Sequence, residues 1–365
     1  MLRKYFVAAL GLLSCTISVA QTAALTVDTA VAAPSNEPAL TITGSVDAYY
    51  KLDFAKTKAN SLTSFTQTHN AFSLGMASVK FEHKGDKVSA VADLGFGPRA
   101  KDFAYTDDGI TQAVKQLYVS YSPAEWLKFT MGTWGTHVGY ELLDPQLNRN
   151  YSMSYMFTNG PFSHTGLKAD ISAGQHSFMV GVANATDFRI PPSDQINKKF
   201  FLAQYSFAPS DNVKFYLNYV GGQNPDTSKT SQFDVVLTAK LSDKFNVGFN
   251  ATSNNTKLWD GTKNTEAFTW GGAALYLNVD PTPAFGLTLR GELFSDKDQL
   301  KPFASATQGG SIFATTLSAN FKTGGFTFIP ELRVDNANNN ALFIDKDGIG
   351  TKSAASFLIA AIYSF

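Results

Sequence analysis

Polar and apolar residues alternate along most of this chain, from Leu40 to the last residue, Phe365. In the first stretch, seven of the eight alternate positions are apolar: Leu40, Ile42, Val46, Ala48, Tyr50, Leu52 and Phe54. Because successive side chains of a β-strand point to opposite faces of a sheet, such a segment has one apolar and one polar face. The pattern predicts a protein built of strands.

About sixteen segments share this alternation, an even number as in bacterial single-chain barrels. They are 40–54, 71–83, 86–97, 112–122, 126–134, 165–173, 176–186, 198–208, 212–221, 231–242, 245–254, 267–280, 284–295, 311–322, 325–335 and 353–365. Short turn-forming connections alternate with longer polar ones, at 55–70, 98–111, 135–164, 187–197, 222–230, 255–266, 296–310 and 336–352. Both chain ends then lie on the side of the short turns.

The composition fits a transmembrane β-barrel, which exposes alternate residues to lipid and lines its lumen with the others. The mean hydropathy is −0.09, while 30 Phe and 14 Tyr are many for a soluble protein. No apolar run after residue 20 approaches the roughly 18 residues of a membrane helix. We predict an all-β protein, a transmembrane antiparallel barrel over 39–365, with short periplasmic turns and long extracellular loops.

The first residues resemble an export signal: basic Arg3 and Lys4, an apolar stretch, and small residues up to Ala20. We therefore expect a signal peptide at 1–20, a flexible periplasmic leader at 21–38, and placement in the bacterial outer membrane. Cys15, the one cysteine, lies inside this signal. A loose lipoprotein box, with Cys15 lipidated, is the alternative interpretation.

The predicted faces can be assigned residue by residue. Phe233, Val235 and Leu237 point to lipid, and Asp234 and Thr238 point into the lumen. A charge on the lipid side at mid-bilayer would cost about 2–4 kcal/mol. The pattern slips between Met76 and Val79 and is interrupted at 271–272, where we expect β-bulges.

The longest connection, 135–164, is the third outside loop, and it is rich in charge and aromatic residues. We predict that it folds into the lumen as a constriction, with charges of both signs that orient polar solutes. The candidate residues of the loop and of inward strand positions are Glu141, Asp144, Arg149, Tyr151, Arg290, Glu292, Glu331, Arg333 and Asp335. In a compatible alternative, these charges form pairs that tie the loop to the wall.

The same stretch carries a family resemblance. The residues Gly132-Thr133-Trp134-Gly135-Thr136-His137-Val138-Gly139-Tyr140-Glu141, Asn148-Arg149-Asn150-Tyr151-Ser152 and Gly160-Pro161-Phe162-Ser163-His164-Thr165-Gly166-Leu167 resemble the signature of OmpL-like putative β-barrel porins of Bacteroidetes and related bacteria. The segment Gly44-Ser45-Val46-Asp47-Ala48-Tyr49-Tyr50 is similar to the first strand of that family. The resemblance implies an outer-membrane channel; it implies no particular solute and no catalytic residues.

We therefore predict a porin for passive diffusion of small hydrophilic solutes, which requires no cofactor. A non-transporting barrel, an adhesin or anchor, is one alternative. The 30 basic and 30 acidic residues balance, which predicts weak ion selectivity and gives no indication of a nucleic-acid partner. The expected partners are outer-membrane lipid and, through the strand that ends at Phe365, the barrel assembly machinery. A homotrimer is an open possibility by analogy with other porins.

Catalytic and metal chemistry find little support in the sequence. A barrel hydrolase would need a nucleophile beside a base, but Ser163 and His164 are adjacent on a strand and point to opposite faces. His137 and Glu141 are too few for a metal site, and we expect them to form a hydrogen-bonded pair within the loop. The segment 345–348 lacks the later ligands of a calcium loop, and a polar hairpin tip is expected instead.

Overall fold

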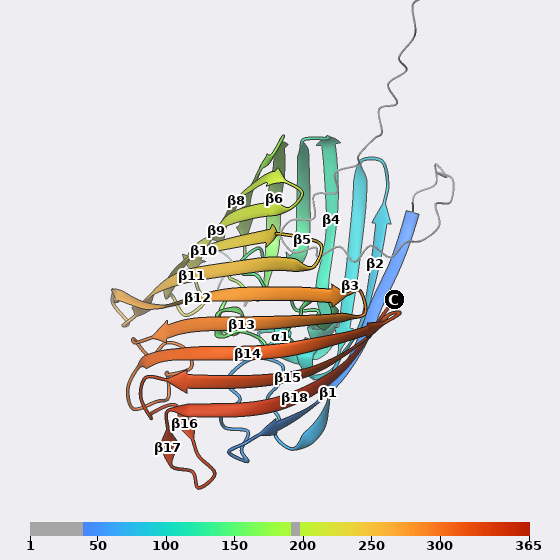
Figure 1. Cartoon of the computed structure of the whole chain (residues 1–365). Helices are drawn as coiled ribbons and strands as arrows, with labels where there is room; N and C mark the ends of the chain where they lie inside the picture. Colours follow the sequence, from blue (N-terminus) through green and yellow to red (C-terminus); the bar gives the residue numbers. More distant parts are fainter. Residues whose placement is uncertain (1–38, 191–197) are drawn as a thin grey trace, which may run out of the picture.

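The computed structural model describes residues 39–190 and 198–365. The predicted signal peptide with Cys15 and the predicted leader lie outside the described residues. Sixteen antiparallel strands form one closed barrel (Figure 1). They are β1 (Ala39–Asp53), β2 (Ala71–Lys84), β3 (Val88–Phe96), β4 (Val114–Ala124), β5 (Leu127–Gly135), β6 (Ser163–Ala173), β7 (His176–Ala183), β8 (Phe200–Ser210), β9 (Val213–Gln223), β10 (Lys229–Lys240), β11 (Phe245–Trp259), β12 (Asn264–Thr282), β13 (Phe285–Asp296), β14 (Gly310–Thr323), β15 (Phe326–Ala337) and β18 (Ser353–Ser364).

The barrel closes by pairing of its first and last strands. β1 and β18 are in register from Ser45, opposite Ser364, to Asp53, opposite Ser356. The last residue, Phe365, exchanges two backbone hydrogen bonds of 3.0 Å with Gly44. A Cβ atom on Gly44 would lie 2.6 Å from the Phe365 ring, so the glycine makes room for this aromatic side chain. Closure removes the free edges that would otherwise promote aggregation.

The strand prediction is confirmed to within a few residues at most ends, but two outside connections are shorter than predicted. β11 and β12 extend beyond the predicted strands and pair up to Trp259 and Asn264, so only residues 260–263 remain of the predicted loop 255–266. The predicted loop 222–230 is reduced to 224–228. Polar strand ends continue the backbone pairing beyond the apolar band, where the alternation no longer indicates a strand.

Side-chain facing agrees with the alternation. On β10, Phe233 is 54% exposed on the outside, whereas its neighbour Asp234 is 1% exposed inside. On β13, Leu289 and Leu293 are exposed while Arg290 and Glu292 are each 0% exposed. These three lumen-facing charges are thus buried among other protein groups.

One of the two predicted bulges is present. Val46 pairs with Ala77 and Ala48 with Leu74, so two residues of β2, Gly75 and Met76, lie opposite Asp47. The Asp47 carboxylate accepts a hydrogen bond of 2.8 Å from the Met76 backbone N–H. The bulge explains the slip in the alternation between Met76 and Val79.

The second predicted bulge, at residues 271–272, is wrong. β12 pairs with β11 without a register shift from Ala267 to Val279. A Cβ atom on Gly272 would lie 2.7 Å from the backbone oxygen of Leu293 in β13 and 3.0 Å from Cγ of Met156 in the third outside loop. The glycine therefore allows close approach of both the neighbouring strand and the loop.

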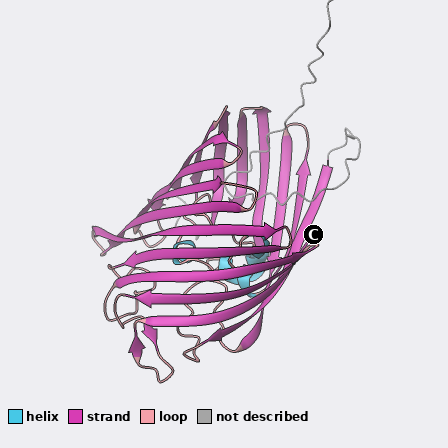
Figure 2. Ribbon diagram, in the orientation of Figure 1, coloured by secondary structure: helices cyan, strands magenta, loops and turns pink. Residues whose placement is uncertain are grey.

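Short helices and a small hairpin lie in the outside loops. They are α1 (Pro98–Phe103), η1 (Gly109–Ala113), η2 (Pro145–Leu147), α2 (Tyr155–Asn159) and the pair β16 (Phe343–Ile344) and β17 (Gly350–Thr351). Figure 2 shows the helices in cyan among the strands, and α1 and α2 carry buried side chains. Between β16 and β17, Asp345 accepts a hydrogen bond from the Gly348 N–H, in agreement with the predicted hairpin tip. Within the described residues, no helix combines the length and apolarity needed to cross a membrane.

Candidate functional site

The third outside loop, residues 136–162, crosses the lumen of the barrel. Asp144 forms an ion pair with Lys115 of β4. Only three residues earlier, Glu141 accepts a hydrogen bond from the Tyr276 hydroxyl of β12, at 3.2 Å. In the closed ring of strands, β4 and β12 lie eight positions apart and therefore face each other. The loop contacts both of these opposite walls.

Two carboxylates of the wall bind backbone N–H groups of the loop. Glu331 of β15 accepts hydrogen bonds from the Tyr151 and Ser152 N–H groups, at 2.8 and 3.1 Å. Glu292 of β13 accepts from the first two N–H groups of α2, those of Tyr155 and Met156, both at 2.8 Å. The N–H groups at a helix start have no partner inside the helix, so the Glu292 carboxylate satisfies donors that would otherwise be unpaired.

Two arginines of the wall bind the loop through its carbonyl groups. Arg290 donates to the Ser152 carbonyl at 2.8 Å and forms an ion pair with Glu141. Arg333 donates to the Met153 carbonyl at 2.7 Å and pairs with its neighbour Asp335 at 2.8 Å. The Asp335 carboxylate in turn accepts from the Tyr155 hydroxyl at 2.8 Å.

The three remaining predicted residues also hold the loop in place. Arg149 forms a bidentate ion pair with Asp280 near the end of β12. The Tyr151 hydroxyl donates to Asp47 of β1, and Asp144 pairs with Lys115 as described above. The structure thus joins every predicted site residue to a contact between loop and wall. These contacts are the ones described by the alternative interpretation, in which charge pairs tie the loop to the barrel.

An aromatic cluster made only of loop residues lies beside these contacts, and the alternation gave no indication of it. It comprises Phe65, Phe103, Met153, Phe157 and Phe162, from the first three outside loops. The buried Arg99 guanidinium lies 4.8 Å from the ring centres of both Phe65 and Tyr151. Aromatic faces attract cations, and this interaction is stronger away from water.

On the wall formed by β8 to β11, a network of polar side chains and backbone groups hydrogen-bonds with the first residues of the third outside loop. Asp234 accepts hydrogen bonds from the Gly139 N–H at 3.0 Å and from Asn218 and Asn250 at 2.8 and 2.6 Å. His137 donates through Nε2 to the Tyr219 carbonyl at 3.0 Å. Burial lowers the pKa of His137 to about 4, so the imidazole is neutral near pH 7.

Lys115 was missed at the sequence level because a bulge hides its orientation. Asp93 pairs with Gln116 and the next residue, Leu94, pairs with Val114, so Lys115 is an extra residue in β4. Its ammonium group contacts Asp93 at 3.0 Å as well as Asp144. Strict alternation from Gln116 would have placed Lys115 on the lipid side.

A cavity of about 570 Å³ remains between the loop and the wall of β9 to β12. Loop residues from Tyr140 to Asn150 cover one side of the cavity, and residues of the short turns, such as Asp211 and Asp243, lie at its other end. The cavity therefore lies on the short-turn side of the loop crossing.

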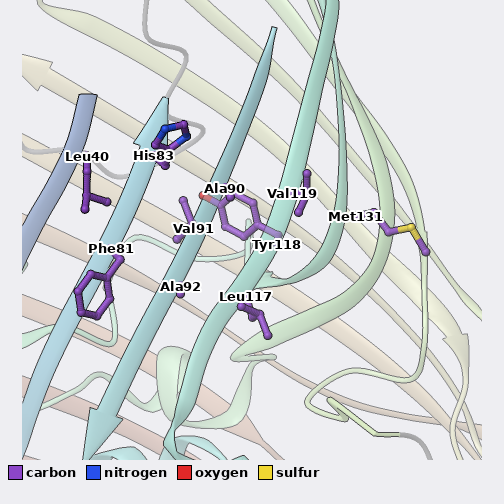
Figure 3. A pocket seen from close by; sticks show the side chains of 10 residues that line it. All are labelled: Leu40, Phe81, His83, Ala90, Val91, Ala92, Leu117, Tyr118, Val119 and Met131. Atoms are coloured by element: carbon purple, nitrogen blue, oxygen red, sulfur yellow. The ribbon is translucent and has the colours of Figure 1, made fainter. Parts of the chain in front are cut away.

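A second hollow, of about 310 Å³, lies on the outer face of β1 to β5 (Figure 3). Its lining includes Leu40 of β1, Phe81, Leu117 and Met131, and the small side chains of Ala90 and Ala92 lie between these larger ones. These side chains belong to the apolar outer band, so the hollow is separate from the lumen.

His137, Glu141 and His164, which were weighed for catalysis or metal binding, have other partners. His137 contacts the Tyr219 carbonyl, whereas Glu141 contacts Arg290, Tyr276 and the Ser154 N–H, so the expected His137–Glu141 pair is replaced by separate contacts to the wall and the loop. His164 hydrogen-bonds with the Thr136 hydroxyl at 3.0 Å. Across the described residues, no group of three or more His, Cys, Asp or Glu side chains is arranged to hold a metal ion.

A family model described as putative beta-barrel porin-2, OmpL-like, matches residues 39–365. A comparison with curated protein sequences gives no match. The match covers the whole barrel and includes the segments whose resemblance to this family was noted in the sequence.

Several solved structures share the fold. Outer-membrane OmpT of Vibrio cholerae is 11% identical, with a TM-score of 0.59 over 91% of this chain and 99% of that chain. The outer-membrane channel DcaP of Acinetobacter baumannii is 12% identical, with a TM-score of 0.60 and the same coverage. An anion-selective porin from Comamonas acidovorans is 9% identical, with a TM-score of 0.60 over 90% of this chain and 100% of that chain. At such identities the similarity concerns the fold alone.

Proposed function

We propose, for a chain that belongs to the OmpL-like β-barrel porin-2 family, that residues 136–162 form the constriction of its channel. The protein is a porin of the bacterial outer membrane, and porins pass small hydrophilic solutes by diffusion through a polar lumen. The observation that supports the proposal is the crossing of the lumen by the loop, from Lys115 of β4 to Tyr276 of β12.

The constriction sets a size limit more than a charge preference. Most charges of the candidate site are satisfied by pairs or hydrogen bonds between wall and loop, including Arg290 with Glu141 and Arg149 with Asp280. A satisfied pair presents little net field to a passing ion. We therefore expect weak ion selectivity and a sharp limit on solute size.

Planar-bilayer recording on the folded protein tests the proposal. We expect stepwise conductance with similar cation and anion permeability, and a larger step when residues 145–157 are deleted and replaced by a short glycine-serine linker. Proteoliposome swelling with sugars of increasing size should show a cutoff that moves to larger sugars in the deletion variant. An unchanged cutoff would place the limiting aperture elsewhere.

A non-transporting barrel is a second candidate, and the same loop crossing favours it. If the loop contacts leave no continuous path, neither swelling nor conductance will be measured in the parent protein. The deletion variant then separates the two functions, because removal of the loop from a plugged barrel creates conductance where none existed.

We also propose that the barrel has no hydrolase activity, since His164 is engaged by Thr136 and a hydrolase needs a free base beside its nucleophile. Measurable phospholipid hydrolysis that is lost in Ser163→Ala would contradict this.

Two partner proposals remain. If the assembly machinery recognises the last strand, Phe365→Ala should assemble more slowly in cells. The second proposal is a homotrimer, by analogy with an OmpT trimer form of Vibrio cholerae. It predicts three-subunit species after cross-linking in membranes.

A further inference from the structure

The cavity beneath the loop crossing has features of a binding site as well as of a passage. It holds about 570 Å³, within the range of about 300–1,000 Å³ typical of small-molecule sites. The loop covers one side of it and inward positions of β9 to β12 cover the other. A solute that enters from the short turns meets this cavity before it reaches the constriction.

An aromatic ring lies flat against the wall of the cavity. The Tyr140 ring stacks on Tyr276, with ring centres 4.1 Å apart and planes inclined by 29°. Gly248, which pairs with Tyr276 on the adjacent strand, leaves space for the same ring, since a Cβ atom there would lie 2.5 Å from Tyr140 Cε2. The wall thus supports one face of Tyr140, and the ring lines the cavity. A second ring, Tyr216 of β9, lines the cavity two strands away, about 10 Å along the sheet.

Amide side chains surround these rings. The Asn278 side chain hydrogen-bonds with the Tyr140 side chain. It also donates to the side-chain oxygen of Asn246, Oδ1, at 2.7 Å. These contacts fix Tyr140 and Asn246 in position. The side-chain amide nitrogen of Asn246, Nδ2, and the Tyr216 hydroxyl form no hydrogen bond within the described part of the chain, and both residues line the cavity. They are available to a solute.

The charges that line the cavity nearly balance. Three cations, Arg149, Lys214 and Lys240, accompany four carboxylates, Asp211, Asp243, Asp280 and Glu141. Arg149 pairs with Asp280, and Lys240 pairs with Asp243 at 2.8 Å. A fourth carboxylate, Glu141, pairs with Arg290. Such a lining attracts neither anions nor cations strongly.

We propose that this cavity binds neutral polyhydroxylated solutes the size of a mono- or disaccharide, with Tyr140 as the stacking surface. This inference deepens the proposed porin function and rests on it. Aromatic rings pack against the C–H face of such solutes, while amide and hydroxyl groups bind their hydroxyls. A charged solute would gain little in a lining where charges of both signs nearly balance, and an apolar solute would leave the amides unpaired.

Sucrose block of single-channel current tests the inference. Sucrose added on the short-turn side should cause concentration-dependent current interruptions, with gluconate at equal concentration as the anionic comparison. Tyr140→Ala should weaken sucrose affinity about tenfold, and Tyr140→Phe, which keeps the ring, should stay within about twofold. Gly248→Ala should act like Tyr140→Ala, because the added methyl group displaces the ring.

The control is Lys263→Gln, which removes an exposed cation of the connection 260–263, outside the cavity lining, and should leave sucrose affinity unchanged. Tighter binding of gluconate than of sucrose, lost in Lys214→Gln, would overturn the inference in favour of an anion site. Conductance without sucrose block would refute the inference and leave the porin function intact. Where no conductance is found, calorimetric titration of sucrose into the protein in detergent decides: binding sensitive to Tyr140→Ala supports the site without transport, and no binding rejects it.

Discussion

Glu331 provides the sharpest test of how the loop is held. Its buried carboxylate accepts hydrogen bonds from the Tyr151 and Ser152 N–H groups and, at 2.7 Å, from the Ser318 hydroxyl. Glu331→Ala leaves these three donors without this acceptor. Since each buried unpaired donor costs about 1–3 kcal/mol, loss of the two backbone bonds alone should weaken loop attachment by about 2–6 kcal/mol.

The assay measures how often the loop detaches. A cysteine placed at Met153, which is 0% exposed, reacts with a membrane-impermeant maleimide only when the loop opens, in a background that lacks Cys15. If labelling follows a local opening equilibrium, a change of 2 kcal/mol or more increases the rate at least about 30-fold. Glu331→Gln keeps one acceptor oxygen and should give an intermediate rate.

A control variant separates this effect from general disturbance of the lumen. Glu82→Ala removes another wall carboxylate, one whose ion pairs are with Lys80 and Lys84, and it should leave the labelling rate unchanged. A heat-modifiable gel shift verifies that each barrel is folded. If Glu331→Ala labels at the parent rate in a folded barrel, the contacts described here do not hold the loop.

Three further predictions concern the wall, the packing and the pH response. Leu289→Lys places a charge on the lipid face near the middle of β13 and should cost about 2–4 kcal/mol, seen as a lower folded fraction on gels, whereas lumen-facing Thr238→Lys should fold normally. Gly272→Leu should displace Met156 and strain the pairing with β13, since a Cβ atom there would lie 3.0 Å from Met156 Cγ and 2.7 Å from the Leu293 backbone oxygen. In barrels that fold, labelling at Met153 should be faster, and equal labelling would disprove the close packing of the loop. Burial lowers the pKa of His137 from 6.5 to about 4. Between pH 4 and 6.5, the detached loop therefore binds more protons than the attached loop. Attachment should then weaken by up to about 1.4 kcal/mol per pH unit as the pH falls from 6.5 towards 4, measured by labelling, and the response should be smaller in His137→Gln.

The outer wall of the barrel was predictable from the sequence alone. Successive side chains of a strand point to opposite faces, so Phe233 beside Asp234 and Leu289 beside Arg290 already specify which side meets lipid. The same local rule gave the strands and, through the terminal alternation up to Phe365, the closure of the sheet. It also placed the inward charges of β13 and β15 among the candidate residues.

Only the tertiary structure decided what those charges contact. Glu331 binds the backbone of Tyr151, which is 180 positions earlier in the chain, and no local periodicity encodes such a pairing. The bulge that turns Lys115 into the lumen and the support of Tyr140 on Gly248 are likewise set by neighbouring strands. Strand facing follows from steric rules between adjacent residues, whereas the path of the loop follows from satisfying buried polar groups across the whole lumen.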